Sequence, residues 1–349
     1  MVGPRPPRRS PRAALRELTA VRAVRFHEYG SPDVLRVEEV PLPEPGPGQV
    51  LVSVEAVGVG FAQTQMRRNI FPAPMWRPRF PVVLGGDVIG RVAGTGPGVT
   101  GVTAGDRVGA YTLYDAYAEQ VVLDSDLLIA VPDDLDAAEA TVLPSSGPIA
   151  SGTMGVANLQ PGETVLVHAA SGGIGHIAVQ LAKLAGAGLV IATAGTAAKC
   201  EFARAMGADV AVDYRRDDWP ALVRDASGGR GVDVILDSVG GDTLRCGIDL
   251  LAPFGRLVFY GSAGGGQDIP RVSPMELIGM KLLTGFALSA WRNARPDRYR
   301  AEHEALIGHL RAGKVRHHLH AVLPLDRVTE AHRDIEERSH CGRIALRVG

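Results

Sequence analysis

The stretch TVLVHAASGGIGHIAVQLAKLAG, from Thr164 to Gly186, decides the fold because it joins a strand pattern, a glycine turn and a helix pattern. Its short apolar run at 165–167 is typical of a parallel strand that helices cover on both faces. From Ile174 to Ala185, apolar residues recur at three- and four-residue spacing, which indicates one buried helix face. A strand, a turn and a helix in this order predict an α/β fold with a doubly wound parallel sheet.

The turn inside this stretch reads Ala170-x-Gly172-x-x-Gly175, a GxGxxG pattern with alanine in the first place. Gly172 would let the backbone approach phosphates, and Gly175 would let the helix pack closely on the strand. The helix N-terminus adds unpaired N–H groups and a positive dipole, which favour an anion. We therefore expect the turn to hold a dinucleotide pyrophosphate, and an ordinary tight turn is the alternative. The expected contacts are Ala170, Ser171, Gly172, Gly173, Ile174 and Gly175.

The residues after the second predicted strand, 189–192, indicate which dinucleotide binds. A site for NAD usually has an acidic residue here, which holds the ribose hydroxyls. This chain instead has Thr193, Thr196 and Lys199 in a run without a carboxylate. Hydroxyls and an ammonium group can bind a 2′-phosphate that a carboxylate would repel, so the segment favours NADPH. The alternative is that Lys199 only solvates the start of a helix.

The composition of the chain narrows its functional class. Its 349 residues are enough for two domains, and its formal net charge of -1 argues against a nucleic-acid partner. The three cysteines are far apart in sequence, so no disulfide framework is expected and a reducing cytoplasm fits. No apolar stretch reaches membrane-spanning length and no signal-peptide pattern is present, so a protein without membrane contact is expected.

The composition and the hydrophobic pattern of the sequence change along the chain and predict four segments. Residues 1–20 are rich in Pro and Arg and are expected to be a disordered extension. Residues 21–145 contain short strand-like runs between Gly and Pro turns, which indicates a compact β-domain. Residues 146–287 alternate between strand and helix patterns and are the expected dinucleotide-binding domain. Residues 288–349 are too few to fold alone, so we expect them to pack back against the β-domain.

Several longer motifs carry a resemblance to a known family. They are AVRFHEYGSPDVL at 23–35, AVGVGFAQTQMRRNIFP at 56–72, FPVVLGGDVIGRV at 80–92, QPGETVLVHAASGGIGHIAVQLAK at 160–183, GADVAVDY at 207–214 and GVDVILDSVGG at 231–241. From Val21 onward the chain resembles the zinc-independent medium-chain dehydrogenases/reductases of the quinone oxidoreductase, or zeta-crystallin, branch. The resemblance implies a GroES-like β-domain, a Rossmann domain and an active site in the cleft between them. It also implies a homodimer that assembles through the edge of the Rossmann sheet.

The same resemblance implies contacts for both ends of the cofactor. Lys199 and Tyr214 would flank the 2′-phosphate, and a surface position at a strand end is the alternative for Tyr214. The contacts implied around the nicotinamide half are Ser238, Gly261, Ser262, Phe286 and Leu288. The last two would present backbone groups to the carboxamide. Turn-forming positions and plain core positions are the alternatives for this set.

No catalytic zinc is expected. In zinc-dependent relatives a cysteine ligand would fall at Phe61, and their GHE motif reads Gly-Gly-Asp at 85–87 here. No cysteine and only one histidine, His27, precede position 150, so the thiolate and imidazole ligands that zinc prefers are missing from this part. His318 and His320 would share one face of a strand. Two histidines on a surface strand are interpreted as solvated side chains rather than as metal ligands.

Without a metal to polarise a carbonyl, hydride must go to an acceptor that is already electrophilic. The expected reaction is therefore the NADPH-dependent reduction of a quinone or a conjugated enone, and the expected partner is this small-molecule substrate. One alternative is a biosynthetic tailoring or enoyl-thioester reductase that acts on a polyketide-like substrate. The other alternative is a non-catalytic NADPH-binding protein, because a phosphate-binding turn alone does not prove chemistry.

The residues expected around the acceptor lie in the predicted β-domain. Certain relatives have Asn and Tyr at the positions of Gly60 and Gln65, and both are absent here. Gln65 is expected to orient a substrate oxygen, and a solvent-facing position is its alternative. Tyr114 is a candidate proton donor, together with Tyr111 and Tyr117. The expected apolar walls of the pocket are Phe61, Ile70, Phe71 and Trp76.

Overall fold

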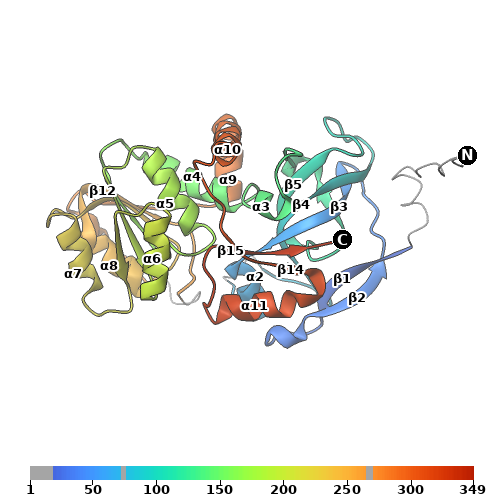
Figure 1. Cartoon of the computed structure of the whole chain (residues 1–349), viewed down its shortest axis with the longest axis horizontal. Helices are drawn as coiled ribbons and strands as arrows, with labels where there is room; N and C mark the ends of the chain where they lie inside the picture. The colour runs from blue at the N-terminus through green and yellow to red at the C-terminus, as the bar shows by residue number, and fades with distance from the viewer. Residues whose placement is uncertain (1–18, 72–75, 265–269) are drawn as a thin grey trace, which may run out of the picture.

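The computed structural model describes residues 19–71, 76–264 and 270–349, which form two lobes (Figure 1). One lobe is a curled sheet of mainly antiparallel strands, and the other is a parallel sheet between two layers of helices. The C-terminal part of the chain returns from the second lobe to the first. Within the described residues no helix is long and apolar enough to cross a membrane.

The first lobe is built on a nine-stranded sheet. Its strands are β1 (Ala20–Phe26), β2 (Arg36–Pro41), β3 (Gln49–Val59), β4 (Val82–Thr95), β5 (Arg107–Tyr114), β6 (Gln120–Asp124), β7 (Ile129–Ala130), β14 (Leu319–Pro324) and β15 (Arg343–Arg347). The main path runs β14-β15-β3-β4-β1-β2, while β5 joins β4, β7 joins β5 and β6 joins β3. The pairs are antiparallel except for β14 with β15, so the sheet curls around one apolar core.

Glycines let the strands of this lobe approach closely. A Cβ atom on Gly85 of β4 would lie 1.9 Å from the carbonyl oxygen of Thr112 on β5. A Cβ atom on Gly90 would lie 2.2 Å from the carbonyl oxygen of Ser53 on β3. Both distances are far below van der Waals contact, so β4 can sit between β3 and β5 only with glycine at these two positions.

The second lobe is built on a six-stranded parallel sheet. Its strands are β8 (Thr164–Val167), β9 (Leu189–Ala194), β10 (Val210–Asp213), β11 (Val232–Asp237), β12 (Leu251–Phe259) and β13 (Leu282–Gly285). They lie in the order β10-β9-β8-β11-β12-β13, so two strand–helix runs diverge from β8. In such sheets the ligand crevice lies at the carboxyl ends of the strands, at the point where the order reverses.

Helices cover both faces of the parallel sheet (Figure 1). The α-helices of the described residues are α2 (Phe61–Arg67), α3 (Ala137–Ala140), α4 (Ser146–Ala157), α5 (Gly175–Leu184), α6 (Ala197–Ala205), α7 (Trp219–Ala226), α8 (Gly241–Leu250), α9 (Leu288–Ala294), α10 (Pro296–Arg311) and α11 (Val328–Glu336). Val165 and Val167 of β8 point into the core under α4, α5 and α6, whereas Leu166 points into the core under α7 and α8. The apolar run at 165–167 is therefore buried on both faces, as predicted from its continuous hydrophobicity.

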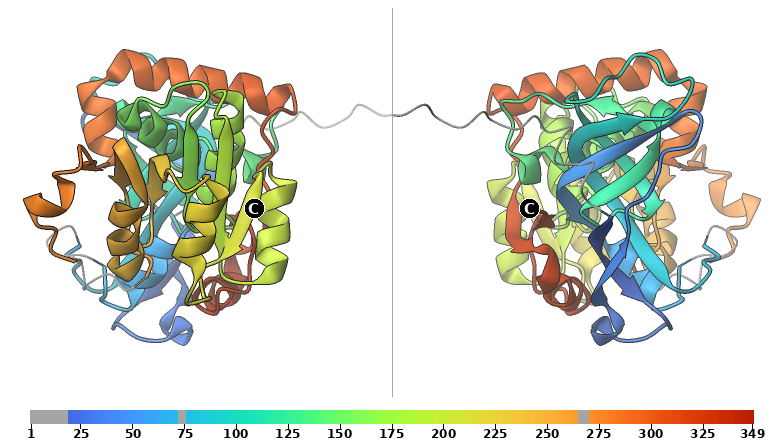
Figure 2. Two further views of the ribbon diagram at one scale, coloured as in Figure 1. Left: turned by 90° about the vertical axis from the view of Figure 1, so that its left-hand side faces the viewer. Right: turned by 90° about the vertical axis from the view of Figure 1, so that its right-hand side faces the viewer.

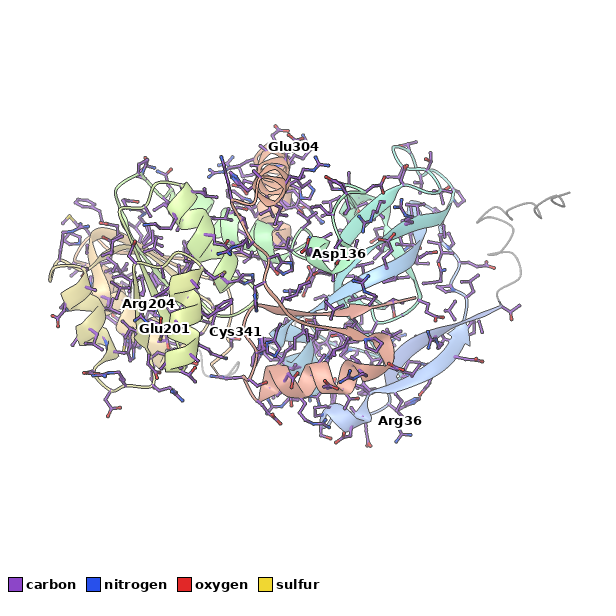
Figure 3. The ribbon with its side chains drawn as sticks, viewed as in Figure 1. Arg36, Asp136, Glu201, Arg204, Glu304 and Cys341 are labelled. Atoms are coloured by element: carbon purple, nitrogen blue, oxygen red, sulfur yellow. The ribbon has the colours of Figure 1, made fainter. Side chains whose placement is uncertain are left out.

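The last third of the chain ties the two lobes together. Helix α10 packs on α4 through Leu306, whose side chain lies against Gly147, and it runs along one side of the molecule (Figure 2). The chain then crosses to the first lobe, where β15 pairs with both β14 and β3. This pairing brings the C-terminal segment to the sheet of the first lobe. It places residues 338–343 directly at the junction of the lobes, where Figure 3 labels Cys341.

The structure confirms the expected α/β fold class with its antiparallel lobe and its doubly wound parallel sheet. The expected extension, residues 1–20, lies outside the described residues except for Thr19 and Ala20, and Ala20 already begins β1. The boundaries expected at 145/146 and 287/288 stay predictions. Strands β1 to β7, β14 and β15 form one sheet, and strands β8 to β13 form the other.

Candidate active site

The glycine turn between β8 and α5 has the geometry of a phosphate-binding turn. A Cβ atom on Gly175 would lie 2.3 Å from the carbonyl oxygen of Ala169, so only glycine lets α5 start this close to the strand. Among the described residues, the backbone N–H groups of Gly173 and Ile174 have no hydrogen-bond acceptor. Unsatisfied amides at a helix N-terminus bind anions well, because they donate hydrogen bonds and carry the positive end of the helix dipole.

A segment of the first lobe crosses this turn. The backbone N–H of Gly342 donates to the carbonyl oxygen of Ser171 at 2.7 Å. Gly342 has a positive φ of 70°, and a Cβ atom there would lie 2.2 Å from the carbonyl oxygen of His318. Only glycine fits this crossing. The turn is therefore held from outside by the chain that leads into β15.

The three residues expected after the second strand occupy different environments. Thr193 is fully buried on β9, and its hydroxyl lies 2.8 Å from Nδ1 of His168. Thr196 is the N-cap of α6, and its hydroxyl accepts a hydrogen bond from the backbone N–H of Lys199 at 3.1 Å. The hydroxyl of Thr193 is thus engaged in the core, whereas Thr196 and Lys199 lie at the open end of the strand, where a 2′-phosphate is expected.

Lys199 lies beside a second cation that sequence reasoning missed. Its ammonium group donates to the carbonyl oxygen of Arg338 at 2.6 Å. The Arg338 guanidinium in turn donates to the Tyr214 hydroxyl at 3.4 Å and to the carbonyl oxygen of Ala263 at 3.1 Å. Burial and the charge of Arg338 lower the pKa of Lys199. Two cations and a phenol thus gather at this strand end, and within the described residues neither cation is paired with a carboxylate.

Tyr214 is fixed at this cluster by a glycine. A Cβ atom on Gly195 would lie 2.7 Å from the Tyr214 hydroxyl, so the tyrosine packs over the bare backbone of the strand end. Its own backbone N–H donates to the carbonyl oxygen of Ala194 at 3.0 Å. The resemblance-based pairing of Lys199 with Tyr214 stays a prediction, but the structure does bring the two residues to one place.

The residues expected near the nicotinamide half lie on the neighbouring strand ends. The backbone N–H of Ala263 donates to the carbonyl oxygen of Ser238 at 2.9 Å, which holds the loops after β11 and β12 together. Gln65 of α2 reaches across from the first lobe, and its Nε2 donates to the carbonyl oxygen of Ser262 at 3.2 Å. Gln65 is only 5% exposed. It therefore faces the junction of the lobes and not the solvent, which was its alternative placement.

Phe286 and Leu288 lie after the last strand of the parallel sheet. The backbone N–H of Phe286 donates to the carbonyl oxygen of Phe259 at 2.9 Å, so this amide is already used inside the lobe. Its ring fills the space above Gly152, where a Cβ atom would lie 2.6 Å from the ring. Leu288 is the first residue of α9. The backbone contacts expected from these two residues stay predictions.

The residues expected to form the pocket walls lie in the first lobe. Trp76 is 5% exposed and stacks on Tyr114, with ring centroids 4.7 Å apart and an interplanar angle of 14°. Phe61 and Phe71 are partly buried against the same apolar cluster. Ile70 follows α2, and its backbone N–H donates to the carbonyl oxygen of Gln65 at 2.9 Å. Phe61 thus begins α2, Ile70 and Phe71 follow its other end, and Trp76 belongs to the core of the lobe.

The region where zinc-dependent relatives would place their metal holds a buried ion pair. The Arg343 guanidinium contacts the Asp87 carboxylate and donates to the Ser146 hydroxyl at 2.7 Å. Asp87 is fully buried, and this burial raises its pKa. Within the described residues no group of three or more His, Cys, Asp or Glu side chains could hold a metal ion. His318 and His320 are exposed, in agreement with their interpretation as solvated histidines.

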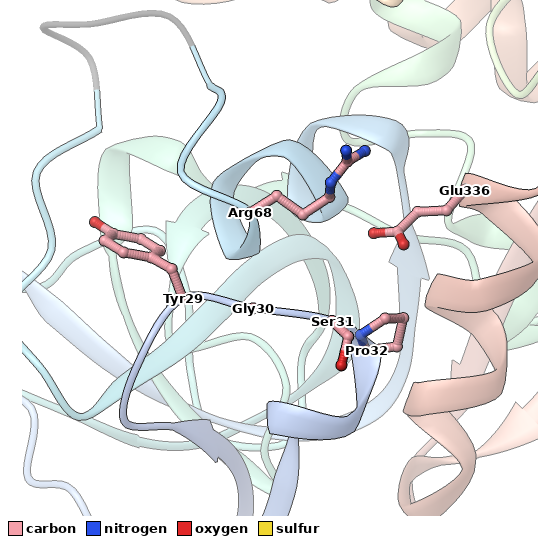
Figure 4. Close-up of a pocket in the computed structure, with 6 residues that line it drawn as sticks. All are labelled: Tyr29, Gly30, Ser31, Pro32, Arg68 and Glu336. Carbon is pink, nitrogen blue, oxygen red and sulfur yellow. The ribbon is translucent and has the colours of Figure 1, made fainter.

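A hollow of about 550 Å³ opens elsewhere on the first lobe (Figure 4). It is lined by the loop at 29–32, by Arg68 and by Glu336. Below it the Arg67 guanidinium is fully buried, contacts Glu336 and donates to Nδ1 of His332 at 3.3 Å. None of the expected site residues lines this hollow, and its charged groups serve to stabilise the contact of α2 with α11.

Comparisons with known proteins agree with this arrangement. A family model described as an alcohol dehydrogenase GroES-like domain matches residues 46–133, and one described as a zinc-binding dehydrogenase matches residues 173–304. A 2-haloacrylate reductase of Burkholderia sp. is 35% identical, over 93% of this chain and 98% of its own length. A mycobacterial protein solved with NADPH is 33% identical, with a TM-score of 0.85 over 93% of this chain and 99% of its own. The Escherichia coli quinone oxidoreductase, also solved with NADPH, is 28% identical, with the same TM-score and coverage.

The fold and the site define a two-lobed dinucleotide-dependent oxidoreductase with a GroES-like lobe and a Rossmann lobe. The chain belongs to the medium-chain dehydrogenase/reductase family, in its zinc-independent quinone oxidoreductase branch. The expected family, fold and enzyme class are therefore confirmed. The expected cofactor, NADPH, is the one bound in two of these relatives.

Proposed function

We propose that this protein transfers hydride from NADPH to a quinone or a conjugated enone, in the cleft between its two lobes. The observation that carries the proposal is the cluster of Lys199, Arg338 and Tyr214 at the end of β9, next to a glycine turn with unsatisfied amides. A carboxylate-free pair of cations suits the 2′-phosphate that distinguishes NADPH from NADH. The NADPH complexes of relatives support the same cofactor.

The residues of this chain fit the cofactor at each of its charged parts. The amides of Gly173 and Ile174 would bind the diphosphate, and Lys199 with Arg338 would bind the 2′-phosphate. Bound NADPH supplies the hydride. The strand ends that carry Ser238 and Ser262 would lie beside its reactive ring, because ligands of doubly wound sheets bind at the carboxyl ends of the strands.

Gln65 is the side chain best placed to orient the acceptor. Its amide nitrogen has two hydrogens, and only one is used on the carbonyl oxygen of Ser262. The second N–H and the amide oxygen remain to hold an acceptor oxygen at the junction of the lobes. A quinone then needs only the hydride and a proton from water, so no fixed general acid is required. An enone would gain more from a donor, for which Tyr114 is the candidate.

Two observations favour an acceptor that is electrophilic without a metal. The chain lacks the cysteine and histidine ligands that zinc prefers in this family's metal-dependent members. The 35% identical relative is named for the reduction of a 2-haloacrylate, which carries a double bond conjugated to a carboxyl group. Both observations point to a conjugated acceptor.

We extend the proposal to assembly and compartment. The outer strand β13 is paired only with β12 among the described strands, and exposed apolar side chains surround it. A second copy could add its own β13 to this edge, which gives a homodimer with one continuous sheet. All three cysteines are free thiols in the structure, which suits the reducing cytoplasm.

A panel of acceptors tests the reaction. Oxidation of NADPH would be followed with a benzoquinone, cyclohexenone, 2-chloroacrylate and a crotonyl thioester, each with and without the protein. We expect turnover with the quinone, the enone or both, and about a tenfold lower kcat/KM in Gln65→Leu with NADPH binding retained. Turnover of the thioester alone would support a tailoring reductase instead. No turnover with any acceptor, despite NADPH binding, would support a binding protein.

A further inference from the structure

His176 follows the last glycine of the phosphate-binding turn and contacts two separate segments of the chain. Its Nδ1 lies 2.8 Å from the carbonyl oxygen of Gly172, inside the turn. Its Nε2 lies 3.2 Å from the backbone N–H of His318, in the segment that leads into β14. The ring is fully buried and stacks on His317, with centroids 5.7 Å apart. The side chain therefore links the turn to the strand that returns to the GroES-like lobe.

These two contacts fix the protonation state of the ring. A backbone N–H can only donate, so Nε2 of His176 must accept and cannot carry a hydrogen. The single ring hydrogen is therefore on Nδ1, which donates it to Gly172. The burial of the ring supports the neutral form, because it lowers the pKa of His176 to about 4.

The bond to Gly172 determines where the next amide points. The carbonyl group of Gly172 and the N–H of Gly173 belong to one planar trans peptide, in which the two point in opposite directions. The carbonyl oxygen accepts from both the ring and the backbone N–H of His176, the latter at 3.2 Å. With the carbonyl held toward His176, the N–H of Gly173 points out of the turn. This amide has no acceptor among the described residues.

We propose that His176 is a positioning residue for the dinucleotide: it orients the Gly172–Gly173 peptide so that the Gly173 N–H faces the diphosphate. The proposal rests on the proposed function, because it assumes that the turn binds a dinucleotide. The diphosphate is common to NADPH and NADH, so a change at His176 affects both. A change at Lys199 or Arg338 should instead affect NADPH alone, because these two residues would contact only the 2′-phosphate.

The test compares three variants by direct titration with NADPH and with NADH. His176→Leu fills the space but makes neither bond, and we expect it to raise both dissociation constants about tenfold. His176→Asn places an amide N–H near the position of Nδ1, and we expect it to restore both constants to within about threefold of the wild type. Gln180→Leu is the matched control: Gln180 bonds to the same return segment at Arg316 and to the backbone carbonyl oxygen of His176, but none of its hydrogen bonds reaches the His176 ring or residues 170–175. It should lower the Tm and leave both dissociation constants unchanged.

The outcomes separate this proposal from the proposed function. Wild-type protein that binds neither dinucleotide would overturn both. Wild-type protein that binds NADPH, with His176→Leu binding equally well, would overturn the role of His176 alone. So would a selective loss of NADPH in His176→Leu, a His176→Asn variant as weak as the leucine variant, or a Gln180→Leu variant that weakens both dinucleotides to the same extent.

Discussion

Lys199 and Arg338 meet at the end of β9 although 139 positions separate them in the sequence. The contact forms because the C-terminal segment leaves α11 and passes the open edge of the Rossmann lobe on its way to β15. Arg338 adopts a positive φ of 54°, which ends α11 and turns the chain toward this edge. Two cations held side by side repel each other, and an anion between them relieves that repulsion.

Removal of either cation should therefore act on NADPH alone. In Lys199→Ala and in Arg338→Ala we expect a 10- to 100-fold weaker affinity for NADPH, roughly the contribution of one charge-assisted hydrogen bond. The affinity for NADH should stay within about twofold of the wild type. Arg333→Ala is the matched control, since Arg333 lies on α11 but pairs with Asp33 on the far side. An equal loss for NADPH and NADH in the two variants would contradict the assignment.

Among single residues, the sequence predicts those whose position in the site follows from their spacing to a nearby motif. The missing carboxylate after β9 pointed to Lys199 and Thr196, because the spacing from a glycine turn to a strand end is fixed by the fold. Arg338 carries no comparable signal: it lies in a run of charged residues, and only the path of the chain makes it a neighbour of Tyr214. His176 is missed for the opposite reason, because a histidine inside an apolar helix pattern reads as a core position.

Among the elements, the parallel strands were the most predictable and β4 the least. The strands predicted at 165–167 and 189–192 are observed as β8 and β9, because runs buried on both faces are continuously apolar. Strand β4 is 14 residues long and begins at Val82. Gly85 and Gly86 interrupt its hydrophobic pattern, and they are required because β5 passes too close to Gly85, and β3 too close to Gly86, for a side chain. Such close approach is a property of the packed sheet and leaves no periodic trace in the sequence.

The edge of the parallel sheet offers a test of the proposed homodimer. Leu282 of β13 is 51% exposed and Ile278, just before it, is 73% exposed. Burial of a second copy on this edge should remove these side chains from water, whereas a charge there should prevent the pairing. We expect wild-type protein to be a dimer by light scattering and Leu282→Lys to be a monomer. Leu184→Lys, at an exposed leucine of α5, is the control that should stay dimeric. A monomeric wild type at micromolar concentration would contradict the proposed assembly.

Across the whole molecule, buried neutral histidines stabilise the contacts between segments. Burial lowers the pKa of His176 to about 4, of His332 to about 3 and of His340 to about 4. In the unfolded chain each would titrate near 6.5. Below that pH the unfolded chain binds more protons than the folded chain, so the free energy of unfolding falls as the pH drops from about 6.5 toward 4.

The lowered pKa values of the buried histidines predict that the stability of the fold decreases measurably in acid. For a fully buried histidine with a pKa near 4, the free energy of unfolding should fall by on the order of 3 kcal/mol as the pH drops from about 6.5 to about 4. Denaturant unfolding at several pH values from about 7.5 to 4.5 would measure the slope. His176→Asn cannot titrate there, so its curve should be flatter than that of the wild type. Equal slopes, or a wild-type stability that does not change over this range, would contradict the neutral buried state. The buried Asp87, whose pKa is raised, acts in the opposite direction.

The proposed chemistry of the whole molecule requires that the protein binds NADPH in preference to NADH. Titration of the wild-type protein with NADPH and with NADH, followed by the fluorescence of the reduced ring, measures this selection directly. The cluster of Lys199, Arg338 and Tyr214 predicts that NADPH binds at least about 100-fold more tightly. Equal affinities, or a preference for NADH, would contradict the central claim.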